Sequence, residues 1–322
     1  MSFINNIKEK ARQNKKRIVL PESMDERVIE AAKIAASENL AEVILIAEEA
    51  PNIEGVTVVS PSKNPLTEEM INGLFELRKE KGMTIEEARE LLLTDYMYYA
   101  CMLVKLGYAD GVVSGACHST SDTLRPSLQI IKTNPGTKLV SSFFIMVVPN
   151  CEYGDNGTFV FSDCGLVQKP NAEELSAIAV SSAESYKKLI GKEPIVALLS
   201  HSSKGSAQHP DVDKVVEALN IVKAESPEIK IDGELQLDAA IIPEIGNSKA
   251  PESEVAGRAN VLVFPDLDSG NIGYKLVERL AKAEAYGPLT QGIAAPINDL
   301  SRGCSVNDIV GVIAITAVQA ME

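Results

Sequence analysis

The stretch RIVLPESMDERVIEAAKIAASENLAEVILIA, residues 17–47, decides the fold class. Two short aliphatic runs, at 17–20 and 42–47, flank a segment at 25–38 whose apolar residues recur at helical spacing. These residues are Val28, Ile29, Ala32, Ala35 and Ala36. Strand, helix and strand in this order are typical of a βαβ unit, which joins two parallel strands through a helix. The stretch therefore predicts an α/β protein.

The same alternation continues along the chain and is interrupted once. Before the interruption we predict three helices between residues 67 and 107, a strand at 110–114, a helix at 119–132 and a strand at 138–148. Pro149 and the polar stretch 150–157 then indicate a domain boundary. After it we predict strands at 158–162, 195–200 and 260–264, and helices at 172–189, 211–224, 271–283 and about 305–320. The prediction is two α/β domains with mainly parallel sheets: residues 1–148 with about 306–322, and residues 149–305.

Composition excludes several classes of protein. The net charge of −14 would repel nucleic acid and anionic membranes. No apolar run approaches the ~18 residues of a membrane span, and the basic N-terminus is more typical of an amphipathic first helix than of a transit peptide. Five cysteines without a CxxC pair favour a reducing cytoplasm over a disulfide framework or a zinc site.

A first polar loop follows the strand predicted at 110–114. Its sequence is GVVSGACHSTSDTLR, residues 111–125. Ser119, Thr120 and Ser121 begin the next helix, where free N–H groups attract anions, and Arg125 adds a forked cation suited to phosphate. The alternative is that a serine only caps the helix and Arg125 is an ordinary surface charge.

A second hydroxyl-rich loop, LLSHSSKGSA at 198–207, contains Lys204. It lacks the order of a Walker A loop, so it is either a general phosphate contact or a plain turn.

A third loop, APINDLSRGCSVND at 295–308, leads into the last predicted helix. It carries Ser301 and Arg302, and Ser305 with Asp308 has the spacing of a capping box. Asp308 is therefore either a structural cap or a functional carboxylate. Cys304 is either an acyl-accepting nucleophile near a helix start or a buried thiol.

Other familiar chemistries lack their motifs. No GxGxxG follows a strand, and three histidines with a misplaced GxSxG give little support to a serine triad. Asp266 and Asp268 are more typical of a turn and a helix cap than of a metal site. We expect no metal and no cofactor.

Four segments resemble phosphate acetyltransferases, also called phosphotransacetylases, in their short single-function form. They are residues 110–126, 232–238, 263–273 and 291–305. The resemblance implies a fold of the isocitrate/isopropylmalate dehydrogenase type, with the active site in a cleft between two domains, and a cytoplasmic homodimer. It implies interconversion of acetyl-CoA plus phosphate with acetyl phosphate plus CoA, in a direct ternary complex in which CoA is a substrate.

The same resemblance implies roles for individual residues. Asp308 would be the base toward the CoA thiol, Arg302 the cation near the reacting groups, and Ser301 a donor to the acyl carbonyl. The implied substrate-binding residues are Arg125, Arg78, Ser119, Thr120, Lys204 and Asn298. Lys79 competes with Arg78 for its role, and His201 stands where family members usually carry Phe.

Three alternative functions stay open at this point. One is a phosphate butyryltransferase with a different acyl pocket. Another is a dehydrogenase on the same fold, and the third is a non-catalytic module that binds acetyl-CoA.

Overall fold

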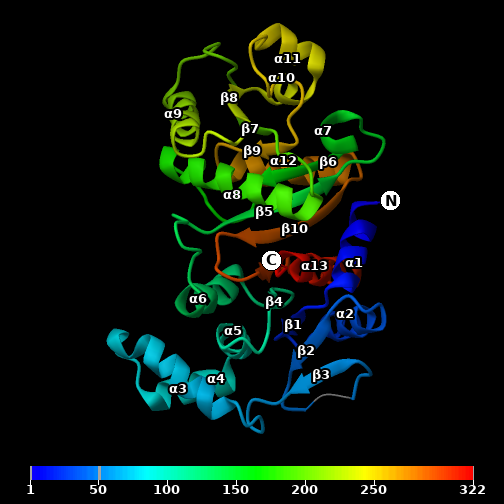
Figure 1. Cartoon of the computed structure of the whole chain (residues 1–322), viewed down its shortest axis with the longest axis vertical. Helices are drawn as coiled ribbons and strands as arrows, with labels where there is room; N and C mark the ends of the chain where they lie inside the picture. Colours follow the sequence, from blue (N-terminus) through cyan, green and yellow to red (C-terminus); the bar gives the residue numbers. More distant parts are fainter. Residues whose placement is uncertain (1, 50–51, 322) are drawn as a thin grey trace. The chain divides into compact units, whose positions relative to one another are not determined.

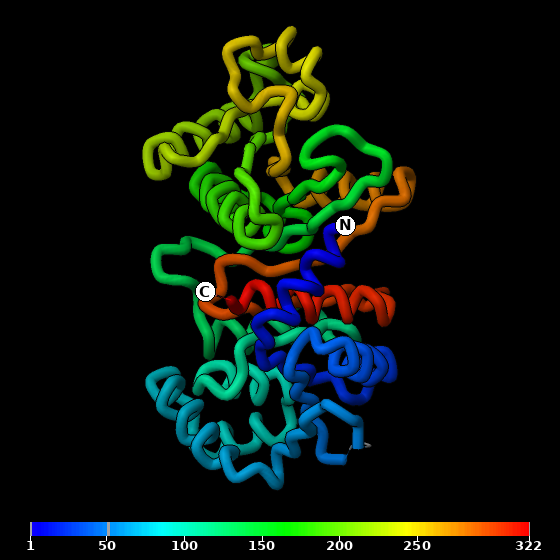
Figure 2. Tube along the Cα trace, turned by 45° about the vertical axis from the view of Figure 1, so that its right-hand side comes forward, coloured from blue at the N-terminus to red at the C-terminus, as the bar shows by residue number. Residues whose placement is uncertain are grey.

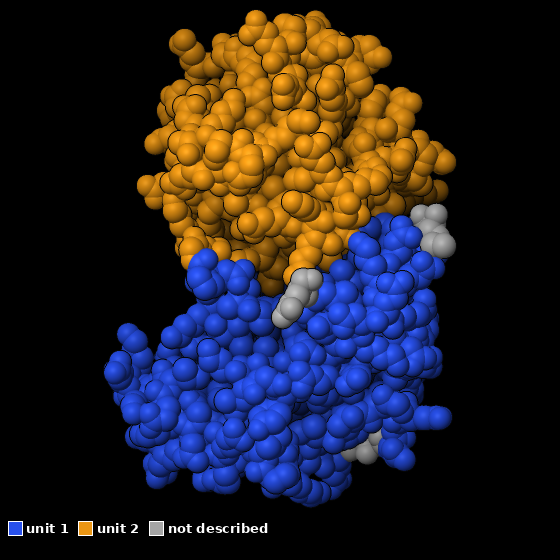
Figure 3. Space-filling model, in the orientation of Figure 1, with its two compact units in different colours: residues 1–135, 293–322 blue, residues 136–292 orange. Residues whose placement is uncertain are grey.

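The computed structural model describes residues 2–49 and 52–321. The chain forms two compact units: unit 1 comprises Met1–Pro135 and Ile293–Glu322, and unit 2 comprises Gly136–Gly292 (Figure 3). Unit 2 is thus one continuous insertion in the sequence of unit 1. The chain passes between the units twice, near residues 135 and 292, and these two segments lie beside each other. Thr133 forms an antiparallel bridge with Ile293, and Ser141 pairs with Gln291.

The two units divide at different residues from those predicted, namely after Pro135 and Gly292 rather than after 148 and 305. Long-range strand pairing explains both differences. The strand β5 (Ser141–Val147) pairs with strands of unit 2 on both sides, and β11 (Ile297–Asp299) pairs with a strand of unit 1. Local sequence patterns do not contain these pairings.

Unit 1 contains a five-stranded sheet in the order β11-β4-β1-β2-β3, with every neighbouring pair parallel. Its remaining strands are β1 (Arg17–Leu20), β2 (Glu42–Ile46), β3 (Val56–Val59) and β4 (Gly111–Ser114). The predicted βαβ unit is confirmed, since β1 pairs with β2 in parallel and α2 (Glu26–Ser37) lies between them in the chain (Figure 1).

The other helices of unit 1 are α1 (Phe3–Gln13), α3 (Thr67–Arg78), α4 (Ile85–Thr94), α5 (Tyr96–Lys105), α6 (Thr120–Ile130) and α13 (Val306–Gln319). A short 3-10 turn, η1 (Lys79–Lys81), follows α3. The three helices predicted between residues 67 and 107 are therefore present. The helix α13 is buried from Ile309 to Val318 and packs against α1, α2 and β4 (Figure 2). The C-terminal helix is thus a core element of unit 1.

Unit 2 contains a six-stranded sheet in the order β10-β5-β6-β9-β7-β8. The pairs β10–β5 and β5–β6 are antiparallel, and the other three pairs are parallel. Its strands besides β5 are β6 (Thr158–Ser162), β7 (Val196–Leu199), β8 (Ile231–Leu235), β9 (Val261–Val263) and β10 (Glu284–Gln291). Its helices are α7 (Tyr153–Asn156), α8 (Ala172–Ile190), α9 (Pro210–Glu225), α10 (Leu237–Ile241), α11 (Pro243–Lys249) and α12 (Leu267–Leu280).

Two further features concern the whole chain. All five cysteines are free thiols. Among the residues that the structure describes, no helix combines the length and the apolar character needed to cross a bilayer.

Candidate active site

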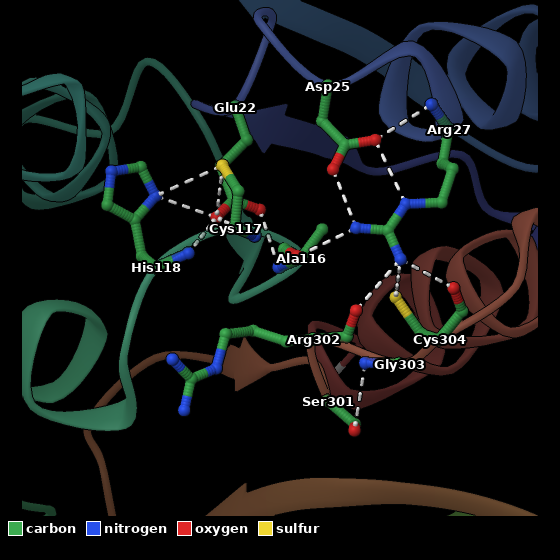
Figure 4. A network of polar contacts seen from close by, with 10 residues as sticks. All are labelled: Glu22, Asp25, Arg27, Ala116, Cys117, His118, Ser301, Arg302, Gly303 and Cys304. Carbon is green, nitrogen blue, oxygen red and sulfur yellow. Dashed lines mark hydrogen bonds and ion pairs between the residues drawn. The ribbon is translucent and has the colours of Figure 1, made fainter.

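The polar loops of unit 1 gather at one edge of its sheet. Since β11, β4 and β1 are parallel neighbours, the loops that follow them leave the sheet side by side. They carry Glu22 after β1, residues 115–119 after β4, and residues 300–305 after β11 (Figure 4). In open α/β sheets ligands bind at this carboxyl edge.

Glu22 holds the loop after β4 in place. Its side chain is fully buried, and its carboxylate accepts hydrogen bonds from three successive backbone N–H groups, those of Ala116 at 2.8 Å, Cys117 at 3.0 Å and His118 at 3.1 Å. His118 Nδ1 lies 2.7 Å from the same carboxylate. Burial by itself raises the pKa of Glu22, but these donors outweigh burial and leave the pKa below its ordinary value. The loop is therefore built around an ionised carboxylate.

The hydroxyl groups at the start of α6 are already engaged. Ser119 is the N-cap residue, and its Oγ donates to Asp122 Oδ2 at 2.6 Å in a capping box. Thr120 Oγ1 donates to Asp299 Oδ2 at 2.6 Å. The capping alternative for Ser119 therefore matches the geometry. Contacts of Ser119 and Thr120 with substrate stay predictions, and the helix N-terminus would offer backbone N–H groups rather than hydroxyl protons.

Asp299 is a buried carboxyl group at the end of β11. It is 3% exposed, and its Oδ1 has no hydrogen-bond partner among the described residues. Burial raises the pKa of Asp299, opposed by Thr120 and Thr123 and reinforced by the charge of Glu22.

The loop after β11 brings three predicted residues to the start of α13. Ser301, Arg302 and Asp308 are all exposed, and Ser301 Oγ accepts a hydrogen bond from Gly303 N at 3.3 Å. Asp308 Oδ2 accepts hydrogen bonds from Ser305 N and Ser305 Oγ, each at 2.8 Å, in the predicted capping box. Asp308 is thus the N3 member of the capping box of α13, and the residue is exposed.

Two arginines near these loops have free guanidinium groups. Arg125 on α6 and Arg302 are exposed, and the guanidinium of neither makes a hydrogen bond or ion pair with the part of the chain that the structure describes. A forked cation without a protein partner is suited to binding a phosphate or a carbonyl oxyanion.

Cys304 does not have the surroundings of a nucleophile. Its thiol is buried, and burial raises its pKa to about 11, although Arg27 opposes the shift. A protonated thiol attacks carbonyl groups poorly, so the geometry favours the buried-thiol alternative.

Lys204 and Asn298, two further predicted contacts, are both engaged with other side chains. Lys204 belongs to unit 2, where its Nζ pairs with Asp232 Oδ1 at 2.5 Å. Asn298 is fully buried, and its Nδ2 donates to Thr316 at 2.8 Å and Gln319 at 2.6 Å. The side chain of Asn298 is thus engaged with α13, and the substrate contacts of Lys204 and Asn298 stay predictions.

Arg78 and Lys79 differ in their availability. Lys79 forms an ion pair with Glu76. Arg78 lines a surface pocket, and its Nε is buried without a hydrogen-bond partner among the described residues. The structure therefore favours Arg78 as the candidate for a second anion contact.

Two sets of residues in the described part of the chain have the ligand types of a metal site. Asp266 caps α12 by accepting a hydrogen bond from Ser269 N at 2.9 Å, as a cap residue would. Within the described residues, the one grouping of three potential ligands is Glu22, Cys117 and His118. The carboxylate of Glu22 accepts three backbone N–H donors, and the absence of a metal stays a prediction.

Sequence reasoning missed Glu22, Arg27 and Asp299. Arg27 donates to the carbonyls of Ala116 and Arg302, and so lies between the two loops (Figure 4). Glu22 could have been noted from its position just after the predicted strand at 17–20, whereas Asp299 is the last residue of β11, a strand that the sequence did not predict.

Comparisons with known proteins point to one family. Residues 2–317 match the family described as phosphate acetyl/butaryl transferase. The phosphate acetyltransferase of Acetivibrio thermocellus is 58% identical over 328 aligned positions, which cover 99% of this chain and 98% of the relative. That of Thermoanaerobacterium thermosaccharolyticum is 56% identical, with 99% and 100% covered.

Among solved structures, a phosphotransacetylase from Streptococcus pyogenes superposes with a TM-score of 0.92 at 44% identity, covering 99% of each chain. A 4-hydroxythreonine-4-phosphate dehydrogenase from Klebsiella pneumoniae gives a TM-score of 0.55 at 13% identity, covering 95% of this chain and 100% of the other. This second likeness concerns the fold alone, and it supports the predicted dehydrogenase-like architecture.

Proposed function

This chain belongs to the phosphate acetyl/butaryl transferase family, and we propose on that premise that it moves an acetyl group between CoA and phosphate. Acetyl-CoA plus phosphate gives acetyl phosphate plus CoA, and the reaction is reversible. The observation that carries the proposal is the loop 301–308, which presents the free guanidinium of Arg302 and the carboxylate of Asp308 at the edge where the helix α6 begins.

Each exposed group has a task in this reaction. Phosphate would bind to Arg125 and to the N–H groups at the start of α6, with Arg78 as a further anion contact. A phosphate oxygen attacks the thioester carbonyl, the new C–O bond forms, and the C–S bond then breaks to release the thiolate. Arg302 and Ser301 would stabilise the negative charge on the carbonyl oxygen between these two steps. In the reverse direction Asp308 orients the CoA thiol and accepts its proton.

We propose direct transfer in a ternary complex, without an acyl-enzyme, a metal or a cofactor. The surroundings of Cys304 support this, because burial raises the pKa of its thiol to about 11. A Cys304→Ala variant is expected to stay active, whereas a covalent route would require it to be inactive.

The decisive measurement is release of free CoA thiol from acetyl-CoA, with and without phosphate and with and without EDTA. We expect release that depends on phosphate and is insensitive to EDTA. Acetyl-, propionyl- and butyryl-CoA compared under the same conditions distinguish an acetyl from a butyryl pocket. Folded protein that releases no CoA in the presence of phosphate would contradict the proposal.

Arg302→Gln and Asp308→Asn test the assignment of roles within that assay. Asp308 Oδ2 accepts two hydrogen bonds from Ser305 and is engaged in the cap of α13, whereas the guanidinium of Arg302 is free to stabilise the charge that develops on the carbonyl oxygen. We therefore expect Arg302→Gln to lower kcat at least as much as Asp308→Asn, on the order of 100-fold. Near wild-type turnover by the Arg302 variant would contradict this assignment.

We propose further that the protein acts in the cytoplasm as a homodimer. Five free thiols fit a reducing compartment. Light scattering coupled to gel filtration would measure the mass of the assembly.

A further inference from the structure

All five N–H donors of the Arg27 guanidinium are used within unit 1. The guanidinium of Arg27 binds Asp25 through two parallel hydrogen bonds, Nε to Oδ1 at 3.0 Å and Nη2 to Oδ2 at 2.7 Å. Its other donors reach three backbone carbonyls, those of Ala116 at 2.8 Å, Arg302 at 2.9 Å and Cys304 at 2.8 Å (Figure 4). A guanidinium has five N–H donors, so Arg27 keeps none for a ligand.

The three carbonyls come from two loops that are distant in sequence. Ala116 lies in the loop that leads to Ser119 and α6, whereas Arg302 and Cys304 lie in the loop that leads to α13. Asp25 is the N-cap residue of α2 and anchors the guanidinium from a third segment. A single side chain therefore ties together the starts of three helices at the candidate active site.

These hydrogen bonds reach the backbone of Arg302, the residue proposed to stabilise the reacting carbonyl oxygen. Arg27 holds the carbonyl of Arg302 and that of Cys304, so it fixes the backbone on both sides of Gly303. The side chain of Arg302 makes no hydrogen bond of its own within the described residues, so its direction depends on that backbone. A displacement of about 1 Å in a reacting group can lower a rate on the order of 100-fold.

We propose that Arg27 is a positioning residue for acyl transfer. It fixes the loop at 301–304, and hence Arg302, relative to the loop at 116–119, and it does not itself bind substrate. The effect on rate rests on the proposed function, whereas the effect on the loops can be measured without turnover.

Arg27→Lys is the first test, and Arg17→Lys is its matched control. Arg17 also pairs twice with an aspartate, Asp110, and donates to one carbonyl, that of Gly107 at 2.9 Å, but it lies at the opposite end of β1 from the site. Lysine keeps the charge but cannot span two loops. We expect Arg27→Lys to lower kcat at least about tenfold while KM for phosphate and CoA changes less than about threefold. Arg17→Lys should lower Tm without this loss of kcat.

Two further measurements separate positioning from general destabilisation. Amide hydrogen exchange at 300–305 and 116–119 should quicken in Arg27→Lys and stay unchanged in Arg17→Lys. Methylguanidinium should restore part of the kcat of Arg27→Ala, because it can occupy the place of the missing group.

Several outcomes would overturn the proposal. A rise in KM for phosphate with kcat intact would make Arg27 an anion ligand. Unchanged exchange in the two loops, or a kcat that falls only in proportion to the unfolded fraction, would remove the positioning role. Absence of turnover in the wild-type protein would contradict the proposed function alone. The exchange measurement would still decide whether Arg27 holds the two loops in place.

Discussion

Two buried carboxyl groups at the site, Glu22 and Asp299, have pKa values shifted in opposite directions, so their ionisation affects the stability of the fold in opposite ways. Glu22 accepts several N–H donors, and its pKa lies below the ordinary value of 4.5. Asp299 has an oxygen without a partner among the described residues, and burial raises its pKa above the ordinary value of 3.8. Ionised Glu22 therefore stabilises the fold, whereas ionised Asp299 destabilises it.

The sign of each effect gives a paired prediction. The stabilisation from Glu22 is present above its unfolded pKa of about 4.5 and is lost as pH falls through the lower folded pKa. The penalty from Asp299 is absent below its unfolded pKa of about 3.8 and grows as pH rises through the higher folded pKa. At pH 7 we expect Glu22→Gln to lower the free energy of unfolding by roughly 1–3 kcal/mol, and Asp299→Asn to raise it by about 1 kcal/mol.

Urea unfolding of both variants and the wild type between pH 4 and pH 8 measures these differences. Each difference from the wild type should shrink toward the acid end of this range. A stabilising effect of Glu22→Gln at pH 7, or a destabilising effect of Asp299→Asn there, would show that the environment of that carboxyl has been misjudged.

The sequence could identify those site residues whose contacts lie within a few positions of them in the chain. Ser305 and Asp308 are three positions apart, and their capping box follows from that spacing. Arg27 bonds to Arg302 across 275 positions, and Cys117 N bonds to Glu22 across 95. No local pattern records such contacts, so these partners appear only once the parallel sheet has brought the loops together.

At the scale of elements, the helices were easier to predict than the strands. Helix α8 begins at a capping box that is visible in the sequence, with Asn171 bonded to Glu174 N at 2.8 Å. The strands β3, β8, β10 and β11 were missed. Two of them contain buried polar residues, which hide the apolar pattern of a strand: Asp232 and Glu234 in β8, and Asn298 and Asp299 in β11. The hydrogen bonds that make their burial tolerable come from distant segments.

The N-terminal cap of α13 affects both the stability of that helix and the position of Asp308. Ser305→Ala removes the hydroxyl that caps the helix and one donor to Asp308, and should cost about 1 kcal/mol of stability. Because Asp308 then loses part of its anchor, we also expect kcat to fall by about threefold to tenfold. Thermal unfolding and steady-state kinetics measure the two effects.

Asn171→Ala is the matched control for that prediction, since it removes the cap of α8 in unit 2. It should lower Tm by a similar amount and leave kcat unchanged. Equal kcat in both cap variants would show that the cap of α13 serves stability alone.

For the whole molecule, net charge limits the size of the ligand rather than its sign. The charge of −14 repels extended polyanions. The proposed substrates are also anions, so their binding depends on local cations such as Arg125 and Arg302 and on helix N-termini. The acidic surface and an anion-binding site are therefore compatible.

The insertion of unit 2 into unit 1 predicts how the chain can be divided. Residues 136–292 are continuous, contain their own six-stranded sheet and should fold alone with a cooperative transition. Residues 1–135 alone lack β11 and α13, whose buried Ile309, Val310, Val312, Ile313 and Ile315 belong to the core of unit 1. Burial of these five side chains contributes roughly 10 kcal/mol, which is comparable with the whole stability of a domain. This fragment should therefore be unfolded or aggregated.

A linked form of unit 1 is the control that makes the division informative. Ala294 N donates to Lys132 O at 3.0 Å, so the two pieces of unit 1 approach each other where unit 2 is inserted. Joining residue 134 to residue 293 through a short Gly/Ser linker should restore α13 to its place and give a cooperative unfolding transition by circular dichroism. If residues 1–135 folded cooperatively without α13, or if the linked form did not fold, the C-terminal helix would not have the central part in the core that its burial indicates.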